Sequence, residues 1–416
     1  MRKMKRKLLF IVLLLVLVLP LQGCSLYEVV FAITELNSGP DFLYENEDKV
    51  LGGSNETSLM LPGASFVDTD GNVIEAHGGQ IQWMSVPAED GGTRECYVWV
   101  GEDKRSGHTG NSVAVYTSED LVNWQFEGDV LQPVPSLEAM EGDEYFKALY
   151  GDLTAEEKEA NYEVINPDAV IERPKMLYNE TTRQYVIWFH SDNSTESNPD
   201  YKYDVGMSGV AVSDSPFGPF RLLGRTRLSY CPDDEIDFYP SSKGEARDMN
   251  LFKDDDGTGY IVYTSENNKT IYISKLNESY TGLATPAEEA VQGVDFIRIF
   301  PGAMREAPAL IKVEGRYYLV TSSTTGWSSN EARVWVSDEI LGDYINLGNP
   351  CVGEGSKITF DTQSTCVFQT QSGQILYLGD RWNGSNLSDS RYIFLPVTIE
   401  DGRFMIIWTS QLQFEP

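Results

Sequence analysis

The stretch Arg305-Glu306-Ala307-Pro308-Ala309-Leu310-Ile311 opens on charged residues and continues as an apolar run. A turn follows at Glu314-Gly315, and a second, aromatic-rich segment begins at Tyr317. Each of four other copies begins on polar residues, becomes apolar, turns on Gly or charged residues and returns as an aromatic-rich strand. These copies begin at His77, Glu172, Arg247 and Gln363. The chain therefore contains five degenerate copies of one β-hairpin.

A second pair of strands is expected after each hairpin. Val113–Tyr116 is the first example, and Val334–Val336 is a later one. Four-stranded units repeated in this way predict an all-β fold, a five-bladed β-propeller of four-stranded blades. We expect residues 61–416 to form the propeller, and Phe404–Trp408 to close the ring by pairing with the residues that lead into it.

Two insertions and one turn complete the expected organisation. Residues 132–166 are acidic and have apolar residues at helical spacing, whereas 224–243 reads as a loop. Either insertion can wall a pocket or be peripheral. Asp254-Asp255-Asp256-Gly257 contains the residue types of a calcium loop, but its spacing favours a plain hairpin turn.

The N-terminus has the organisation of an export signal. Arg2 to Lys7 is basic, Leu8 to Pro20 is apolar, and Leu21-Gln22-Gly23-Cys24 follows. This ending resembles the lipobox of bacterial lipoproteins, which implies cleavage after residue 23 and lipid modification of Cys24. We therefore expect residues 1–23 to be a signal peptide and 24–60 a tether and lead-in. The protein would be exported and held by lipid on the outer face of a bacterial cell membrane.

Composition limits the partners and cofactors. The formal charge of −31 argues against nucleic acid, because phosphate binding needs clustered Lys and Arg. Five Cys without a CxxC pair, together with three His, do not form a zinc site, so no metal is predicted. Disulfides among Cys96, Cys231, Cys351 and Cys366 are compatible with export but are not needed by so large a domain. The sequence leaves that question open.

The residues that open the innermost strands converge on one end of a propeller axis. They include the carboxylates of Glu172, Asp248 and Glu306 and the amide of Gln363. Crowded carboxylates push one another's pKa values apart and leave one of them protonated near neutral pH. Hydrolysis of a glycosidic bond uses such an acid together with a base that activates water. The pattern therefore indicates a glycoside hydrolase.

Motifs spread over residues 65–410 carry a family resemblance. They are Glu75-Ala76-His77-Gly78-Gly79, Trp99-Val100-Gly101-Glu102-Asp103, Glu172-Arg173-Pro174-Lys175, Ala246-Arg247-Asp248-Met249, Ser265-Glu266-Asn267-Asn268, Arg305-Glu306-Ala307-Pro308, Thr325-Gly326-Trp327, Gln363-Ser364-Thr365 and Gly379-Asp380-Arg381-Trp382. Together they resemble glycoside hydrolase family 43, and within it the exo-β-1,3-galactanase-like branch.

The resemblance implies roles for four residues. Glu306 occupies the general-acid position, and Asp248 the position of the acid that orients it and tunes its pKa. Most of the family has an Asp base where this chain reads His77-Gly78-Gly79, so the usual base is missing. The galactanase branch shares this departure, which assigns the handling of water to Gln363 and Glu172. The expected stereochemical outcome is inversion.

Sugar recognition is expected from aromatic faces and from hydrogen-bonding groups at strand ends. Trp327 and Trp382 are candidates for stacking on a galactose ring. The candidates for hydrogen bonds to substrate are Glu102, Asn267, Arg381 and His77.

The expected activity is exo-acting, inverting release of galactose from β-1,3-galactan, the backbone of plant arabinogalactan, or from β-1,3-galacto-oligosaccharides. An α-L-arabinofuranosidase, a β-galactofuranosidase and a non-catalytic surface glycan-binding lipoprotein are the alternatives. No cofactor is required, and the sequence leaves a structural calcium ion open without supporting one.

Overall fold

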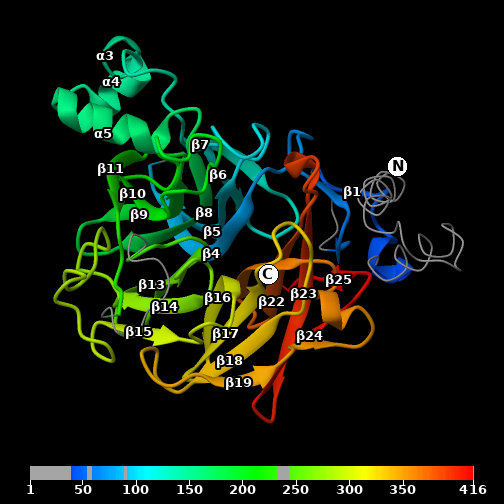
Figure 1. Ribbon diagram of the computed structural model, residues 1–416. Helices are drawn as coiled ribbons and strands as arrows, with labels where there is room; N and C mark the ends of the chain where they lie inside the picture. Colours follow the sequence, from blue (N-terminus) through cyan, green and yellow to red (C-terminus); the bar gives the residue numbers. More distant parts are fainter. Residues whose placement is uncertain (1–38, 54–58, 89–90, 232–242, 416) are drawn as a thin grey trace, which may run out of the picture.

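The computed structural model describes residues 39–53, 59–88, 91–231 and 243–415. Five four-stranded antiparallel sheets stand around a common axis as a β-propeller, as the repeats predict (Figure 1). The predicted signal peptide and Cys24 lie outside the described residues, as does most of the predicted 224–243 loop.

The five blades follow one another along the chain. Blade 1 contains β4 (His77–Pro87), β5 (Thr93–Glu102), β6 (Val113–Ser118) and β7 (Gln125–Leu131). Blade 2 contains β8 (Val170–Asn179), β9 (Gln184–Asp192), β10 (Met207–Ser213) and β11 (Arg221–Thr226). Blade 3 contains β12 (Met249–Lys253), β13 (Gly259–Ser265), β14 (Thr270–Lys275) and β15 (Phe296–Ile299). Blade 4 contains β16 (Arg305–Val313), β17 (Arg316–Ser323), β18 (Arg333–Ser337) and β19 (Ile345–Gly348). Blade 5 contains β21 (Gln363–Gln369), β22 (Ile375–Arg381), β23 (Arg391–Glu400) and β24 (Arg403–Ile407), and the short β20 (Cys351–Val352) pairs in parallel with β24.

Alternation along each strand explains why the blades pack face to face. Successive side chains of a strand point to opposite faces of its sheet. In β5, Tyr97 and Trp99 enter the apolar core shared with blade 5, whereas Cys96, Val98 and Val100 enter the core shared with blade 2. Because both faces are buried, the strands read as nearly continuous apolar runs. The same arrangement fills the other blade interfaces.

The innermost strands β4, β8, β12, β16 and β21 contact one another in sequence around the axis, and β21 returns to β4. The prediction that Phe404–Trp408 pairs with the lead-in is wrong. β24 instead pairs with β23 and β20 inside blade 5. The lead-in strand β2 (Leu59–Met60) pairs with the last strand, β25 (Leu412–Gln413), while β1 (Val50–Gly52) pairs with β3 (Ser65–Val67).

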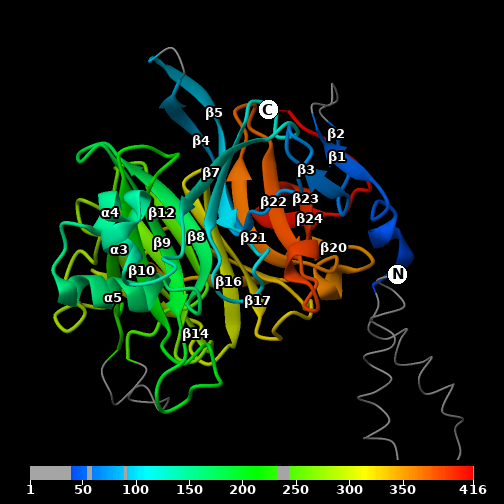
Figure 2. The ribbon, with the colours of Figure 1, turned by 90° about the horizontal axis from the view of Figure 1, so that it is seen from above.

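The predicted helical insertion is present on the outer side of blade 2. It forms α3 (Ala139–Gly142), α4 (Glu144–Tyr150) and α5 (Ala155–Ile165), and α5 contacts β11 and β8. Figures 1 and 2 show these helices at the periphery, away from the axis. Thr154 and Glu157 form a capping box that fixes the start of α5. Short 3-10 helices occur at Asp41–Tyr44, Ser356–Ile358 and Leu387–Asp389.

Two local expectations can be compared with the structure. Asp254 lies in the hairpin turn between β12 and β13, and its carboxylate binds Lys312 Nζ at 2.6 Å and the Tyr317 hydroxyl at 2.5 Å. The predicted hairpin turn is therefore confirmed. Among the described cysteines, Cys96, Cys231, Cys351 and Cys366 are buried and no disulfide joins them.

A buried charge cluster holds the junction between blades 5 and 1. Asp380 accepts hydrogen bonds from the Gly78 N–H at 2.9 Å and the Thr365 hydroxyl at 2.6 Å, and its Oδ1 lies 3.2 Å from His77 Nδ1. Burial lowers the pKa of His77, but hydrogen bonds and charges from Asp380 and Glu75 outweigh it and raise the pKa to about 9. At neutral pH, His77 is therefore mainly protonated inside the propeller.

Replacing this carboxylate should destabilise the fold. We expect Asp380→Asn to lower the free energy of unfolding by about 3–5 kcal/mol, because removing one partner leaves the other charge buried without compensation. Since the pKa of His77 is raised from 6.5, its contribution is complete below pH 6.5 and is lost as pH rises through about 9. Urea unfolding between pH 6 and 10 measures both effects. Asp338→Asn, which breaks an exposed ion pair with Arg316, is the matched control and should cost at most about 1 kcal/mol. An equal loss in the two variants would contradict the prediction.

Candidate active site

A pocket of about 220 Å³ opens at one end of the axis and takes residues from all five blades. It is lined by Glu102, Lys104, His108, Glu172, Arg173, Tyr203, Asp248, Glu306, Gly326, Trp327, Gln363 and Trp382. The volume lies below the range of about 300–1,000 Å³ that is typical of sites for drug-sized ligands. It therefore suits one sugar unit.

A repeated backbone irregularity positions the residues of the pocket floor. The strand register shifts directly after His77, Glu172 and Glu306. The following residue has a left-handed backbone in each case, with φ of 58° at Gly78, 53° at Arg173 and 52° at Ala307. Such bulges bend the strand and re-aim the side chains beside them. Non-glycine residues in this conformation are strained and concentrate at functional sites.

Each of these bulges is held by a carboxylate from the preceding blade. The bulge N–H groups donate to Asp380 at 2.9 Å (Gly78), to Glu102 at 2.7 Å (Arg173) and to Asp248 at 3.0 Å (Ala307). The three acids thus fix the backbone from which the neighbouring site residue projects. Because Asp248 binds the N–H of Ala307, its carboxylate lies beside Glu306.

Glu306 has the properties of a general acid. Burial, followed by the negative charge of Asp248, raises its pKa to about 8, although Arg173 partly opposes the shift. At neutral pH the carboxyl group is therefore mainly protonated and can donate a proton to a leaving oxygen. Its Oε1 accepts a hydrogen bond of 3.0 Å from Gln363 Nε2.

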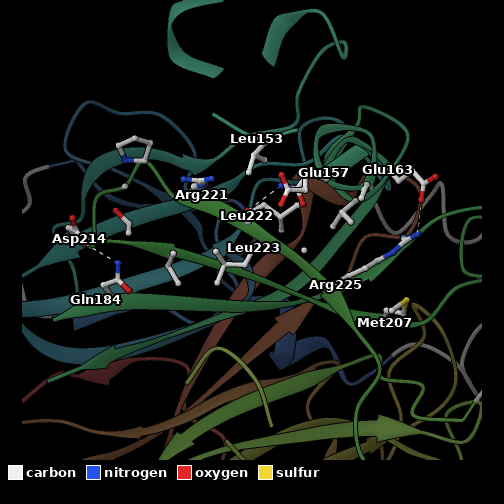
Figure 3. Close-up of a pocket in the computed structure, with 18 of the residues that line it drawn as sticks. Leu153, Glu157, Glu163, Gln184, Met207, Asp214, Arg221, Leu222, Leu223 and Arg225 are labelled. Carbon is white, nitrogen blue, oxygen red and sulfur yellow. Dashed lines mark hydrogen bonds and ion pairs between the residues drawn. The ribbon is translucent and has the colours of Figure 1, made fainter. Parts of the chain in front are cut away.

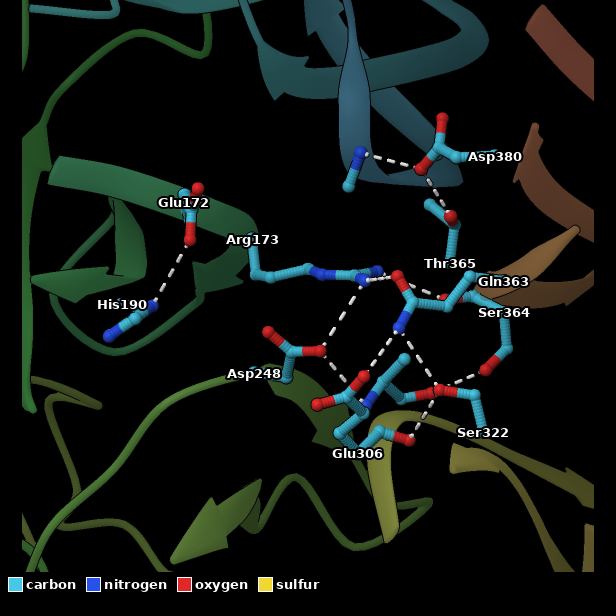
Figure 4. A network of polar contacts seen from close by, with 12 residues as sticks. Glu172, Arg173, His190, Asp248, Glu306, Ser322, Gln363, Ser364, Thr365 and Asp380 are labelled. Carbon is cyan, nitrogen blue, oxygen red and sulfur yellow. Dashed lines mark hydrogen bonds and ion pairs between the residues drawn. The ribbon is translucent and has the colours of Figure 1, made fainter. Parts of the chain in front are cut away.

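The amide of Gln363 has its orientation fixed by its partners (Figure 4). Its oxygen accepts from Arg173 Nη2 at 2.6 Å and from Trp382 Nε1 at 2.8 Å. Both partners are donors only, so the amide oxygen must face them. The amide nitrogen consequently faces Glu306 and the Ser322 hydroxyl, each at 3.0 Å.

Glu172 is an ionised carboxylate on the other side of the pocket. Its Oε1 accepts from Lys104 Nζ at 3.0 Å and the Tyr203 hydroxyl at 2.9 Å, and Oε2 lies 3.5 Å from His190 Nδ1. Burial raises its pKa, but the charges of Lys104 and His190 outweigh it and hold the pKa well below the ordinary range. Lys104 also lies 2.5 Å from Glu102, so one ammonium group serves two carboxylates.

The structure places seven of the ten predicted catalytic and substrate-binding residues in the pocket. They are Glu102, Glu172, Asp248, Glu306, Trp327, Gln363 and Trp382. His77 is fully buried behind Trp382, with ring centroids 5.6 Å apart, and it stacks on Tyr392. The Arg381 guanidinium is buried and donates to the carbonyls of Leu43 and Phe360. It therefore anchors the lead-in to blade 5, while Asn267 is an exposed residue outside the pocket.

Five pocket residues are not among the predicted site residues. Arg173 and Gly326 lie within motifs that carry the family resemblance, and Lys104 directly follows one, but the sequence predicts no separate role for these three residues. Tyr203 and His108 come from loops between β9 and β10 and between β5 and β6. Loops carry no periodic signal, so no pattern in the sequence places these two residues at the axis.

A larger hollow of about 870 Å³ lies on the outer side of blade 2, between α5 and β11 (Figure 3). Its acidic residues include Glu157, which caps α5, and Glu163, which lies 3.5 Å from Arg225. Both are exposed, and no predicted site residue lines this hollow. The paired acids that hydrolysis requires are in the smaller axial pocket.

Two further properties apply to the part of the chain that the structure describes. Within it, no cluster of three or more His, Cys, Asp or Glu side chains could hold a metal ion. Within the same residues, no helix is both long enough and apolar enough to cross a membrane.

Comparisons with known proteins agree with the site. The model of glycosyl hydrolases family 43 matches residues 175–390. A solved GH43 β-1,3-galactosidase with galactodeoxynojirimycin is 33% identical, with a TM-score of 0.68 over 85% of this chain and 100% of that chain. An exo-β-1,3-galactanase from Phanerochaete chrysosporium with β-1,3-galactotriose is 27% identical, with a TM-score of 0.63 over 85% of this chain and 67% of that one.

An exo-β-1,3-galactanase from Clostridium thermocellum is 29% identical, with a TM-score of 0.63 over 86% of this chain and 66% of that one. None of the curated proteins is significantly similar in sequence. The family model covers half of the chain, and the first of these structures is matched over its full length. The chain belongs to glycosyl hydrolase family 43 and is a glycoside hydrolase.

Proposed function

We propose that the protein is an exo-acting, inverting hydrolase that releases galactose from β-1,3-galactan, the backbone of plant arabinogalactan. The observation that carries this proposal is Glu306, a mainly protonated acid beside Asp248 in a pocket for one sugar unit. Three similar structures, from a β-1,3-galactosidase and two exo-β-1,3-galactanases, support the choice of sugar and linkage.

In the proposed reaction, Glu306 gives its proton to the glycosidic oxygen as the bond to the anomeric carbon breaks. Water attacks that carbon from the opposite face, and the ionised Glu172 takes up the proton that the water releases. Positive charge develops on the sugar ring as the bond breaks, and the ionised Glu172 can stabilise it. Gln363 already has partners for both its oxygen and its N–H₂ group. Through its N–H₂ group, Gln363 holds the carboxyl group of Glu306 in place for proton transfer to the leaving oxygen.

Incubation of residues 25–416 with β-1,3-galactobiose and with debranched arabinogalactan tests the proposal. We expect galactose to be released first as the α-anomer, and NMR identifies the anomer as it forms. If arabinose is released from a nitrophenyl arabinofuranoside and no galactose is released from the galactobiose or the arabinogalactan, the enzyme is an arabinofuranosidase and not a galactanase. Binding of galactan without hydrolysis of any substrate would favour a surface glycan-binding lipoprotein.

We also propose that Cys24 carries the lipid that holds the enzyme on the outer face of the membrane. Wild type expressed in a bacterial host should label with a fatty-acid probe and sediment with membranes. Cys24→Ser should lose both properties and keep its hydrolytic activity, because Cys24 precedes the described domain by more than a dozen residues. Cys366→Ser changes a thiol that is buried in blade 5 and should leave labelling intact. Unchanged labelling of Cys24→Ser would contradict the proposal.

A further inference from the structure

Two rings from blades that are not neighbours meet over the axial pocket. His108 lies in the loop between β5 and β6 of blade 1, and Trp327 lies in the loop between β17 and β18 of blade 4. Their ring centroids are 5.5 Å apart, and both residues line the pocket. Blade 5 stands between these two blades in the ring, so the contact bridges across it.

Blade 5 supports the bridge from below. Trp327 packs edge-on against Trp382, with ring centroids 5.0 Å apart. A Cβ atom at Gly384, in the loop after β22, would lie 3.0 Å from the Trp327 Cβ, so the indole also rests closely on that loop. The rings of His108, Trp327 and Trp382 thus form one continuous wall across the blade 5 side of the pocket.

The acid lies between this wall and blade 3, because Glu306 accepts a hydrogen bond from Gln363 of blade 5 and lies beside Asp248. Glu306 begins the innermost strand of blade 4, and Asp248 precedes that of blade 3. Among the described residues, blade 3 contributes only Asp248 to the pocket lining. The leaving oxygen must lie beside Glu306, and the wall closes the blade 5 side, so the leaving part of the substrate is directed toward blade 3.

From this arrangement we propose that His108 is a specificity-determining residue for exo action. Its contact with Trp327 closes the pocket where the terminal galactose would otherwise carry a further substituent. A chain that continued beyond that sugar would collide with the wall, so only a free non-reducing end is accepted. The inference rests on the proposed function, since it assigns the part of the same pocket that selects the chain end.

Two substrates test whether His108 selects a free non-reducing end or only contributes to binding of the sugar. The first is β-1,3-galactotriose, and the second is the same trisaccharide with its terminal galactose 3-O-methylated. Wild type should hydrolyse the second far more slowly than the first. We expect His108→Ala to raise kcat/KM for the capped substrate relative to the free one on the order of tenfold or more, because a steric block is removed.

Arg105→Ala is the matched control, since Arg105 is exposed in the same loop, binds Asp103 and does not line the pocket. It should leave the ratio unchanged. His108→Phe should keep the ring contact and the wild-type ratio. The inference would be overturned if His108→Ala lowered kcat/KM for both substrates in parallel, or if it left the ratio of the two kcat/KM values unchanged. Failure of wild type on the uncapped triose would instead overturn the proposed function.

Discussion

Glu306→Gln should lower kcat for β-1,3-galactobiose by about 10²–10⁴-fold, the range that a positioned general acid supplies. The amide side chain has the size of the carboxyl group and can still accept the hydrogen bond from Gln363 Nε2. The fold and the pocket should therefore persist, while the proton for the leaving oxygen is lost. Galactose release at saturating substrate measures the effect.

A substrate with a good leaving group distinguishes acid catalysis from a general loss of structure. Nitrophenolate departs without protonation, so the defect of Glu306→Gln should be at least about tenfold smaller on nitrophenyl β-galactoside. Glu339→Gln, in an exposed position on the same blade, should behave as wild type on both substrates. Equal losses of Glu306→Gln on the two substrates would contradict the assignment of the acid.

The pH dependence has a defined sign. The raised pKa of Glu306, about 8, belongs to the enzyme without substrate, and only the protonated form can donate. The value of kcat/KM should therefore fall as pH rises through about 8, by about tenfold for each further pH unit. This fall, the alkaline limb of the pH profile, should be absent in Glu306→Gln.

Arg173→Met should have the second largest effect, a loss in kcat on the order of 10²-fold, which is what a small misplacement of reacting groups costs. The guanidinium donates to Gln363 Oε1 at 2.6 Å and to the Ser364 carbonyl at 3.0 Å. It also lies 3.4 Å from Asp248. Without it, the amide of Gln363 loses one of the two donors that fix its orientation, and Asp248 loses its counter-ion.

The pH profile of this variant gives a second, independent readout. The positive charge of Arg173 lowers the pKa of Glu306, so its removal should move the alkaline limb of kcat/KM to higher pH. Arg173→Lys keeps a charge and loses the planar fork, so it should lower kcat with little movement of the limb. Thermal unfolding of both variants detects any loss of folded protein. A limb that moves to lower pH in Arg173→Met would contradict the assigned role.

Much of the fold could be predicted because the propeller is built from local repeats. Each blade has its own apolar strands and turns, and a strand buried on both faces is visible as an apolar run such as Leu376–Leu378. Closure of the ring was predicted incorrectly. The pairing of β2 with β25 depends on two short segments at opposite ends of the described chain, and neither has a pattern that identifies its partner.

The candidate site divides in a similar way. Glu172, Glu306 and Gln363 were found because they open repeated strands, and all three line the pocket. Arg381 has the same sort of strand-end position, yet its guanidinium binds backbone carbonyls in a buried setting. Sequence position indicates the end of a strand from which a side chain projects, but it does not distinguish an axial pocket from a buried anchor.

By itself, the sequence determined the number of blades, the start of each innermost strand and the chemical types gathered at the axis, because these follow from local alternation and repetition. The tertiary structure alone decided which charges meet. The pKa of Glu306 depends on burial and on Asp248 in another blade, and the ion pair between Lys104 and Glu172 joins two blades. Electrostatic interactions depend on distance in space and on burial, and neither is written in the order of residues along one chain.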